Sequence, residues 1–140
     1  NKKFIKVFGG DQLRPNLHVQ DYCDAVEVFI QAPKEKIANQ TFNVGYQNMS
    51  ISEIAFLVKD VVQKFFNIKD IDIIKTPSDD MRSYHINSDK INEVLNFKPK
   101  HSVKEAIEDL CLAYKNGNIV NSMNNDMYYN VKLLKKLNAI

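Results

Sequence analysis

The hydrophobic residues of this chain follow two kinds of spacing: short β-branched runs, and longer stretches in which an apolar residue recurs every three or four positions. The second spacing is typical of amphipathic helices that bury one face. From Asp21 it continues to about Pro33, so Asp21 is expected to be the N-cap of that helix. His18 and Asp21 are expected to hold the loop and start the helix rather than to do chemistry. Further helices are predicted at residues 50–65, 88–95, 102–117 and 127–137.

Two of these helix starts carry a serine followed three residues later by a glutamate, Ser50 with Glu53 and Ser102 with Glu105. This spacing predicts a capping box, in which each side chain binds the backbone N–H of the other residue. Ser88 is predicted to cap the short helix at residues 88–95. Runs of β-branched and aromatic residues predict strands at residues 4–8, 41–45 and 71–75. The pattern therefore indicates an α/β fold of short strands with about four to five helices.

The composition is that of an ordinary globular domain. With 140 residues, of which 44% are hydrophobic and 26% charged, the chain is predicted to form a single domain, residues 1–140, with a docking tail at residues 118–140. A net charge of +2 with scattered lysines argues against a nucleic-acid partner. No apolar run approaches the roughly 20 residues that cross a bilayer, so no membrane partner is expected and a cytoplasmic location is the default expectation.

The cysteines and histidines offer no metal chemistry. Cys23 and Cys111 both fall in helical apolar patterns without a Cys-x-x-Cys spacing, and we expect both to be buried thiols. His18, His85 and His101 are dispersed along the chain. No metal site is therefore expected.

Arginine is scarce in a chain that is rich in lysine. Of nineteen basic side chains only Arg14 and Arg82 are arginine, and each lies in a short polar segment between apolar runs. A guanidinium is a rigid planar fork that can hold two phosphate oxygens at once, whereas lysine is a flexible point charge. The placement suggests a phosphate clamp, and the alternative is two surface arginines without a partner.

Five motifs occur in one order along the chain. They are Arg14-x-x-x-His18-Val19-x-Asp21, Phe42-Asn43-Val44-Gly45, Ser50-Ile51-x-Glu53-Ile54-Ala55, Asp80-x-Arg82 before Lys90-Ile91-x-x-x-Leu95-x-Phe97-x-Pro99, and Ser102-Val103-x-Glu105-x-Ile107. In this order the chain resembles the C-terminal, substrate-binding part of extended short-chain dehydrogenases/reductases, the NAD-dependent sugar-nucleotide epimerases and dehydratases. The resemblance covers residues 4–137 and implies a fold that lacks the main Rossmann nucleotide-binding half.

The resemblance also implies a ligand and its contacts. The ligand would be a nucleoside-diphosphate sugar, with Arg14 and Arg82 on the diphosphate and Asn16 as a polar neighbour. Met49 is placed near the base, although filling the core is the alternative for this side chain. His85 stands where some relatives have an acidic group toward the ribose, and this departure leaves the ribose contact open.

The cofactor and the catalytic residues are expected outside this chain. The four glycines, Gly9, Gly10, Gly45 and Gly117, do not form the glycine-rich turn that holds a pyrophosphate, so NAD is expected to bind to a missing N-terminal half. Homodimer contacts are expected through that same half. We therefore interpret the chain as a fragment of a longer enzyme that is inactive alone, with a separately encoded binding module as the other possibility.

Several questions stay open at this point. Tyr128-x-x-x-Lys132 has the spacing of the family's catalytic pair, but it lies in the tail, and we interpret it as helix packing at i, i+4. The base, the sugar, epimerase against dehydratase, NAD against NADP and the oligomeric state are not decided by these residues. The alternative function is a non-catalytic interaction or regulatory module derived from such a domain.

Overall fold

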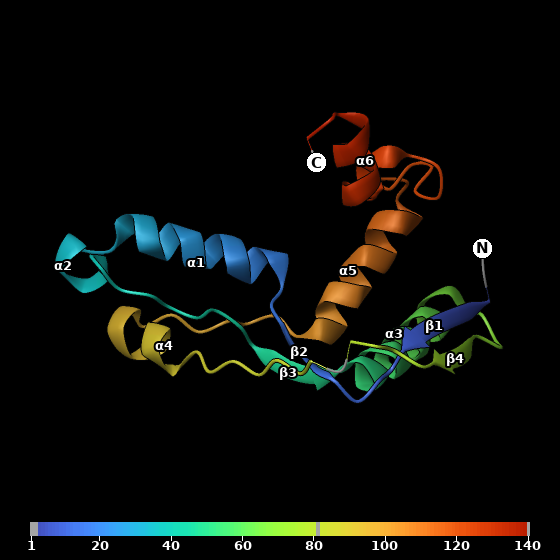
Figure 1. Ribbon diagram of the computed structural model, residues 1–140, viewed down its shortest axis with the longest axis horizontal. Coiled ribbons are helices and arrows are strands. Elements are labelled where there is room, and N and C mark those ends of the chain that lie inside the picture. Colours follow the sequence, from blue (N-terminus) through green and yellow to red (C-terminus); the bar gives the residue numbers. More distant parts are fainter. Residues whose placement is uncertain (1–2, 81, 140) are drawn as a thin grey trace. The chain divides into compact units, whose positions relative to one another are not determined.

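The computed structural model describes residues 3–80 and 82–139, so the middle residue of the Asp80-x-Arg82 motif lies outside the described residues. The chain divides into two compact units, one up to Glu108 and one from Asp109 onward. The single domain with a tail from residue 118 stays a prediction. The elements are labelled in Figure 1.

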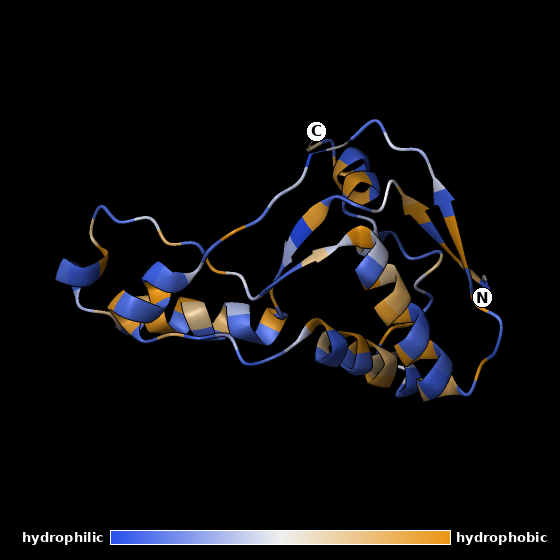
Figure 2. Ribbon diagram, turned by 90° about the horizontal axis from the view of Figure 1, so that it is seen from below, coloured by the Kyte–Doolittle hydropathy of each residue, from blue (hydrophilic) through white to orange (hydrophobic). Residues whose placement is uncertain are grey.

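The described residues form both strands and helices, and the last four elements are all helical. In chain order the elements are β1 (Phe4–Phe8), β2 (Leu13–Asn16), α1 (Val19–Gln31), α2 (Lys34–Ile37), β3 (Gln47–Ser50), α3 (Ile51–Phe66), β4 (Asp72–Thr76), α4 (Asp89–Leu95), α5 (Val103–Lys115), the 3₁₀ turn η1 (Asp126–Tyr128) and α6 (Asn130–Lys136). The predicted α/β class is confirmed. In Figure 2 helices α1 and α3 carry both hydrophilic and hydrophobic residues, as amphipathic helices do.

The strands form two separate pairs within the described residues. β1 and β4 are parallel, with Phe4 opposite Asp72 and Phe8 opposite Thr76. β2 and β3 are antiparallel, with Leu13 opposite Ser50. The second pair was not predicted from the sequence, because each strand has four residues and β2 contains Pro15, which cannot donate to a ladder.

The core of the first unit joins α1, α4 and the segment between α2 and β3. Ala25, Ile91 and Phe97 are buried together, and Ile91 is 0% exposed. Phe42 and Val44 pack against this cluster, with the Phe42 ring 5.3 Å from that of Phe29. The strand predicted at residues 41–45 is therefore wrong, because its apolar side chains pack on helices while its backbone joins no ladder.

Helix caps follow the sequence in some places and not in others. Both capping boxes are confirmed: Glu53 N donates to Ser50 Oγ at 3.1 Å, and Glu105 N donates to Ser102 Oγ at 3.2 Å. Ser88 does precede α4, but its hydroxyl accepts a hydrogen bond from Gly45 N at 2.9 Å instead of capping the helix. The fold therefore uses this serine to fix the Gly45 turn.

The prediction that Asp21 is the N-cap of α1 is wrong. His18 caps this helix, and its Nδ1 accepts a hydrogen bond from Gln20 N at 3.1 Å. Asp21 lies in the first turn and is 1% exposed. Its carboxylate accepts hydrogen bonds from Lys100 N at 3.0 Å and His101 N at 2.9 Å, and it lies 2.8 Å from His101 Nδ1. Asp21 therefore fastens α1 to the segment that precedes α5, about 80 residues away.

Two further expectations need correction. Cys111 is buried as predicted, but Cys23 is exposed, because it faces outward from α1. In the second unit Tyr128 ends the η1 turn while Lys132 lies in α6, so the two do not pack as i, i+4 neighbours of one helix. Lys132 pairs with Asp126 instead.

Candidate functional site

The antiparallel pair β2–β3 is the platform for the candidate site. Arg14 lies opposite Met49, and Asn16 lies opposite Gln47. Residues that face each other across an antiparallel pair project from the same side, and so do residues two apart on one strand. Arg14 and Asn16 therefore share one face with Met49, which lies far from both of them in the sequence.

The loop that carries Arg82 is fastened along β2 and β3. Leu13 N donates to Ser83 Oγ at 2.8 Å, and Tyr84 N donates to Leu13 O at 3.0 Å. The Asn48 side chain binds both backbone groups of Ile86, donating from Nδ2 to the carbonyl and accepting at Oδ1 from the N–H, each at 3.0 Å. These bonds hold the segment after Arg82 against the platform much as a third strand would.

Arg14 is held in one orientation by contacts on several sides. Its Nη1 donates to Arg82 O at 2.6 Å and to its neighbour Leu13 O at 2.8 Å. The guanidinium carbon lies 5.2 Å from the centre of the Tyr84 ring, which is within cation–π range. The side chain is 28% exposed. The guanidinium is thus oriented without any ligand.

Both arginines approach the same carboxylate, Asp80. Arg82 donates from Nε to Oδ1 at 2.7 Å and from Nη2 to Oδ2 at 2.9 Å, which is a bidentate pair. Arg14 Nη2 lies 3.8 Å from Oδ2. Two guanidinium groups that are 68 residues apart in the sequence therefore converge on one anion.

This geometry sets the ionisation of Asp80. The side-chain hydrogen bonds from Arg82, followed by the one from its backbone N–H, lower the pKa of Asp80 to about 2. The same hydrogen bonds, followed by the Coulomb attraction of the carboxylate, raise the pKa of Arg82. Asp80 and Arg82 are therefore both charged at neutral pH, and the two guanidinium groups approach one carboxylate.

The other predicted site residues have different surroundings. Asn16 Nδ2 donates to Arg14 O at 2.8 Å and to Gln47 O at 3.1 Å, so this side chain braces the platform. Met49 is half-buried on β3. His85 is exposed and lines a surface cavity of about 490 Å³ with residues of α4 and of the loop before α5. The described lining of that cavity includes neither arginine, so His85 belongs to a different part of the surface.

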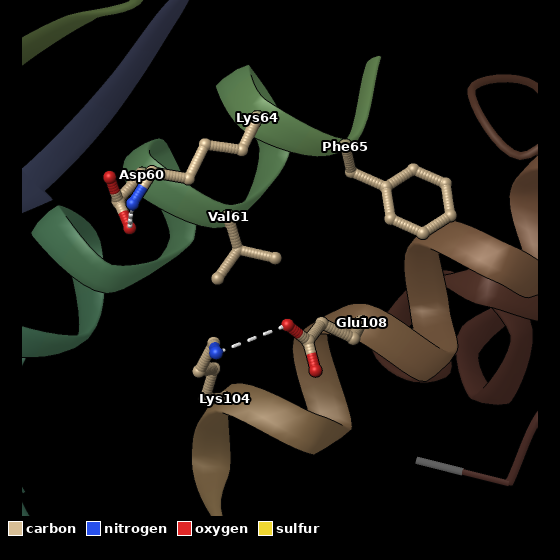
Figure 3. A pocket seen from close by; sticks show the side chains of 6 residues that line it. All are labelled: Asp60, Val61, Lys64, Phe65, Lys104 and Glu108. Carbon is tan, nitrogen blue, oxygen red and sulfur yellow. Dashed lines mark hydrogen bonds and ion pairs between the residues drawn. The ribbon is translucent and has the colours of Figure 1, made fainter. Parts of the chain in front are cut away.

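A second cavity, of about 270 Å³, lies between α3 and the start of α5 (Figure 3). Its charged residues pair with each other: Lys64 Nζ lies 2.8 Å from Asp60 Oδ2, and Lys104 Nζ lies 3.5 Å from Glu108 Oε1. Because each lysine already has a carboxylate partner one helical turn away, this cavity offers little net charge to an anionic ligand. The arginine cluster is the better candidate for binding phosphate.

Sequence reasoning missed three residues of the candidate site. Asp80 was noted as part of the Asp-x-Arg motif but not as the partner of both arginines. Tyr84 and Asn48 were not singled out, because stacking on Arg14 and binding to Ile86 depend on contacts between distant segments. The Asp80-x-Arg82 spacing carried a usable signal, since an aspartate commonly binds the backbone two residues on.

No group of three or more His, Cys, Asp or Glu side chains within residues 3–80 and 82–139 could hold a metal ion. The described helices are too short or too polar to cross a membrane. Gly10 has a packing role, because a Cβ at this position would collide with Ser52 Oγ, so its missing side chain makes room for α3.

The fold places this chain among proteins of the extended short-chain dehydrogenase/reductase fold. L-threonine dehydrogenase from Phytophthora infestans has a TM-score of 0.68 at 15% identity, and 83% of this chain covers 38% of that one. UDP-glucose 4-epimerase from Bifidobacterium longum, solved with NAD⁺ and UDP, has a TM-score of 0.63 at 18% identity, over 84% of this chain and 36% of that one. The predicted fold is confirmed.

The sequence comparisons point to one family within that fold. The model of the NAD-dependent epimerase/dehydratase family matches residues 1–45, which include Arg14, His18 and Asp21. The dTDP-glucose 4,6-dehydratase of Escherichia coli is 27% identical over 113 residues, covering 75% of this chain and 30% of that enzyme. The resemblance predicted from the motifs is thus confirmed, and the chain spans about a third of the length of the curated relatives it matches.

Proposed function

We propose that this chain is the substrate-binding part of an NAD-dependent nucleotide-sugar epimerase or dehydratase, in which Arg14 and Arg82 hold the nucleoside diphosphate. The observation that carries the proposal is the convergence of both guanidinium groups on Asp80. A place where two arginines meet one carboxylate suits an anion with two or more negative charges. A diphosphate has that charge, and each phosphate matches the planar fork.

The charge of the cluster bears on the class of substrate. Solved proteins of similar fold include both an L-threonine dehydrogenase and a UDP-glucose epimerase. An amino acid carries one carboxylate and one ammonium group, and needs no second guanidinium. The paired arginines therefore favour a nucleoside diphosphate over an amino acid as the ligand.

The proposed role of this chain is to orient the substrate. Arginines that hold the diphosphate fix the direction in which the attached sugar leaves the site, and binding energy from the nucleotide end can then position the sugar carbon that reacts. NAD supplies oxidation and reduction in this family, and no described residue of this chain is assigned a step of that chemistry. The 140-residue chain alone is expected to be inactive, and sugar turnover by it would contradict this.

The remaining site residues take supporting roles in this proposal. Asn16 braces the strand pair below Arg14, and Met49 shares the arginine face and is available to contact the base. His85 would reach only a part of the ligand that extends toward α4. NAD binding and homodimer contacts are proposed for parts of the protein outside these residues, and a cytoplasmic location stays a prediction.

Calorimetric titration with UDP-, dTDP-, GDP- and CDP-sugars tests the proposal. Arg14→Ala and Arg82→Ala should each weaken binding by roughly 10- to 100-fold, since a charge-assisted hydrogen bond contributes about 1.5–3 kcal/mol. Lys104→Ala, which removes a cation from the cavity between α3 and α5, is the matched control and should change affinity less than about twofold. L-Threonine should not compete.

If neither arginine variant changes the affinity, Arg14 and Arg82 do not bind the diphosphate and the proposal is wrong. Arg82→Lys sharpens the test, because it keeps the charge and loses the planar fork. Full retention of affinity by this variant would mean that charge alone, and not bidentate recognition, holds the ligand. Insensitivity to all of these changes would favour an interaction or regulatory module.

A further inference from the structure

Asp80 occupies the point at which the proposed clamp would hold its ligand. Its carboxylate accepts from Arg82 Nε at 2.7 Å and Nη2 at 2.9 Å, and Arg14 Nη2 lies 3.8 Å away. The Nε and Nη2 pair is the edge of a guanidinium that also suits two oxygens of one phosphate. A phosphate that takes this edge of Arg82 must therefore first remove the carboxylate.

The backbone on either side of the Asp80 carboxylate has other anchors, apart from one hydrogen bond from Arg82 N to Asp80 Oδ1 at 3.2 Å. Arg14 sits in β2, where its guanidinium is also held by Leu13 O, Arg82 O and the Tyr84 ring. The segment after Arg82 is fastened by Ser83, Tyr84 and Ile86 to the strand pair. Strand β2 and the segment from Ser83 to Ile86 therefore keep these anchors if the carboxylate leaves.

The ion pair is also open to water. The Arg82 side chain is 72% exposed and that of Asp80 is 43% exposed. Exposed ion pairs contribute little to folding stability, because water screens them and both side chains lose freedom on pairing. A carboxylate that contributes little to the fold can be exchanged for a ligand at low cost.

We propose that Asp80 is an internal counter-anion, which keeps the guanidinium groups of Arg14 and Arg82 together in the absence of ligand and is displaced by the incoming diphosphate. The proposal rests on the function proposed above and adds a residue that sets the affinity of the clamp. Without a counter-charge two guanidinium groups this close repel each other. With Asp80 in place, the two guanidinium groups and the carboxylate present a net charge of +1 to the ligand instead of +2. Asp80 therefore weakens anion binding while it orders the empty site.

The neighbouring residue provides a matched control. Asp79→Asn removes the same charge one residue earlier, from an exposed side chain, whereas Asp80→Asn removes the carboxylate that both arginines contact. Both variants have the same net charge. A difference between them therefore reports the local contact and not the overall electrostatic field.

The experiment is an NMR titration of the 140-residue chain with inorganic pyrophosphate. The chain has only two arginines, so its arginine Nε–H region contains two side-chain signals. Asp80→Asn should tighten pyrophosphate binding about three- to fivefold relative to the unmodified chain, as expected for removing one nearby exposed charge, and Asp79→Asn should stay within about twofold. In the unmodified chain the Arg82 Nε–H signal should move as phosphate replaces the carboxylate.

Unchanged or weaker binding in Asp80→Asn, with Asp79→Asn as reference, would overturn the proposal. The clamp itself is judged separately: it stands if Arg14→Ala and Arg82→Ala still weaken binding, and it fails together with this proposal if they do not. Asp80→Ser should behave like Asp80→Asn, which excludes an effect of the new amide. Uridine, which lacks phosphate, should bind equally to all variants, and a gain with uridine would also count against the displacement of Asp80.

Discussion

Replacing the buried carboxylate of Asp21 by an amide should destabilise the fold strongly. In Asp21→Asn the side chain keeps its shape but offers one oxygen where the carboxylate offered two. Lys100 N, His101 N and the His101 ring all approach that side chain within 3.0 Å. The new amide nitrogen must therefore face at least one of these donors.

The expected cost follows from these contacts. A buried donor left without an acceptor costs about 1–3 kcal/mol, and hydrogen bonds to a neutral oxygen are weaker by roughly 1 kcal/mol than those to a carboxylate. The sum is a loss of about 2–4 kcal/mol in the free energy of unfolding. For 140 residues, an unfolding entropy of about 2.1 cal/mol/K per residue converts this loss into a fall in Tm of roughly 7–14 °C.

Urea denaturation and thermal melting followed by circular dichroism at about pH 6 provide the measurement. Glu27→Gln is the control, because it removes a carboxylate from the exposed side of the same helix, where its partner is Gln31 Nε2 at 2.9 Å. The control should shift the free energy of unfolding by less than about 0.5 kcal/mol. If Asp21→Asn unfolds as readily as Glu27→Gln, the carboxylate does not fasten α1 to the segment before α5 and the reasoning fails.

Two further predictions concern the same unit. Burial raises the pKa of Asp21, but hydrogen bonds from His101 and Lys100 lower it more, so the net pKa is below 3.8. The hydrogen bond to Asp21 raises the pKa of His101 above 6.5. The Asp21 contribution is present above about pH 4 and lost below it, and that of His101 is present below about pH 6.5 and lost above it. Stability measured against pH should therefore be highest between these values, and His101→Gln should remove the alkaline decline; an unchanged alkaline limb would contradict the assignment. Ile91→Ala should lower the free energy of unfolding, measured by urea denaturation, by about 2–5 kcal/mol, because Ile91 is 0% exposed. Ile74→Ala is the control at a 45% exposed position and should lower it by less than about 1 kcal/mol. Equal effects of the two changes would show that Ile91 is not in the core.

The elements that could be predicted from the sequence are those with local causes. Helix α3 combines an apolar stripe with the capping box of Ser50 and Glu53, so all of its signals lie within one segment. Strand β4 begins one residue later than predicted, which is within the usual uncertainty of boundaries. Such elements depend little on the rest of the chain.

The elements that could not be predicted depend on distant contacts. The stretch 41–45 has the composition of a strand, yet Phe42 and Val44 pack on α1 and α4, and the ladder forms instead at Gln47–Ser50 opposite β2. Asp21 has the residue type and position of an N-cap, but its carboxylate binds backbone groups about 80 residues away. The local sequence indicates neither the position of this ladder nor the distant partners of Asp21.

The same distinction applies to the candidate site. The scarcity of arginine singles out Arg14 and Arg82, and the structure places their guanidinium groups together, while their role as a clamp stays a prediction. The sequence could not tell how two like charges tolerate this proximity. Asp80 answers that question physically, because one carboxylate between two guanidinium groups turns a repulsion into two attractions. Any ligand that replaces Asp80 must bring at least the same negative charge to the two guanidinium groups, and a neutral sugar cannot, so the counter-anion that orders the empty site also restricts which ligands can enter it.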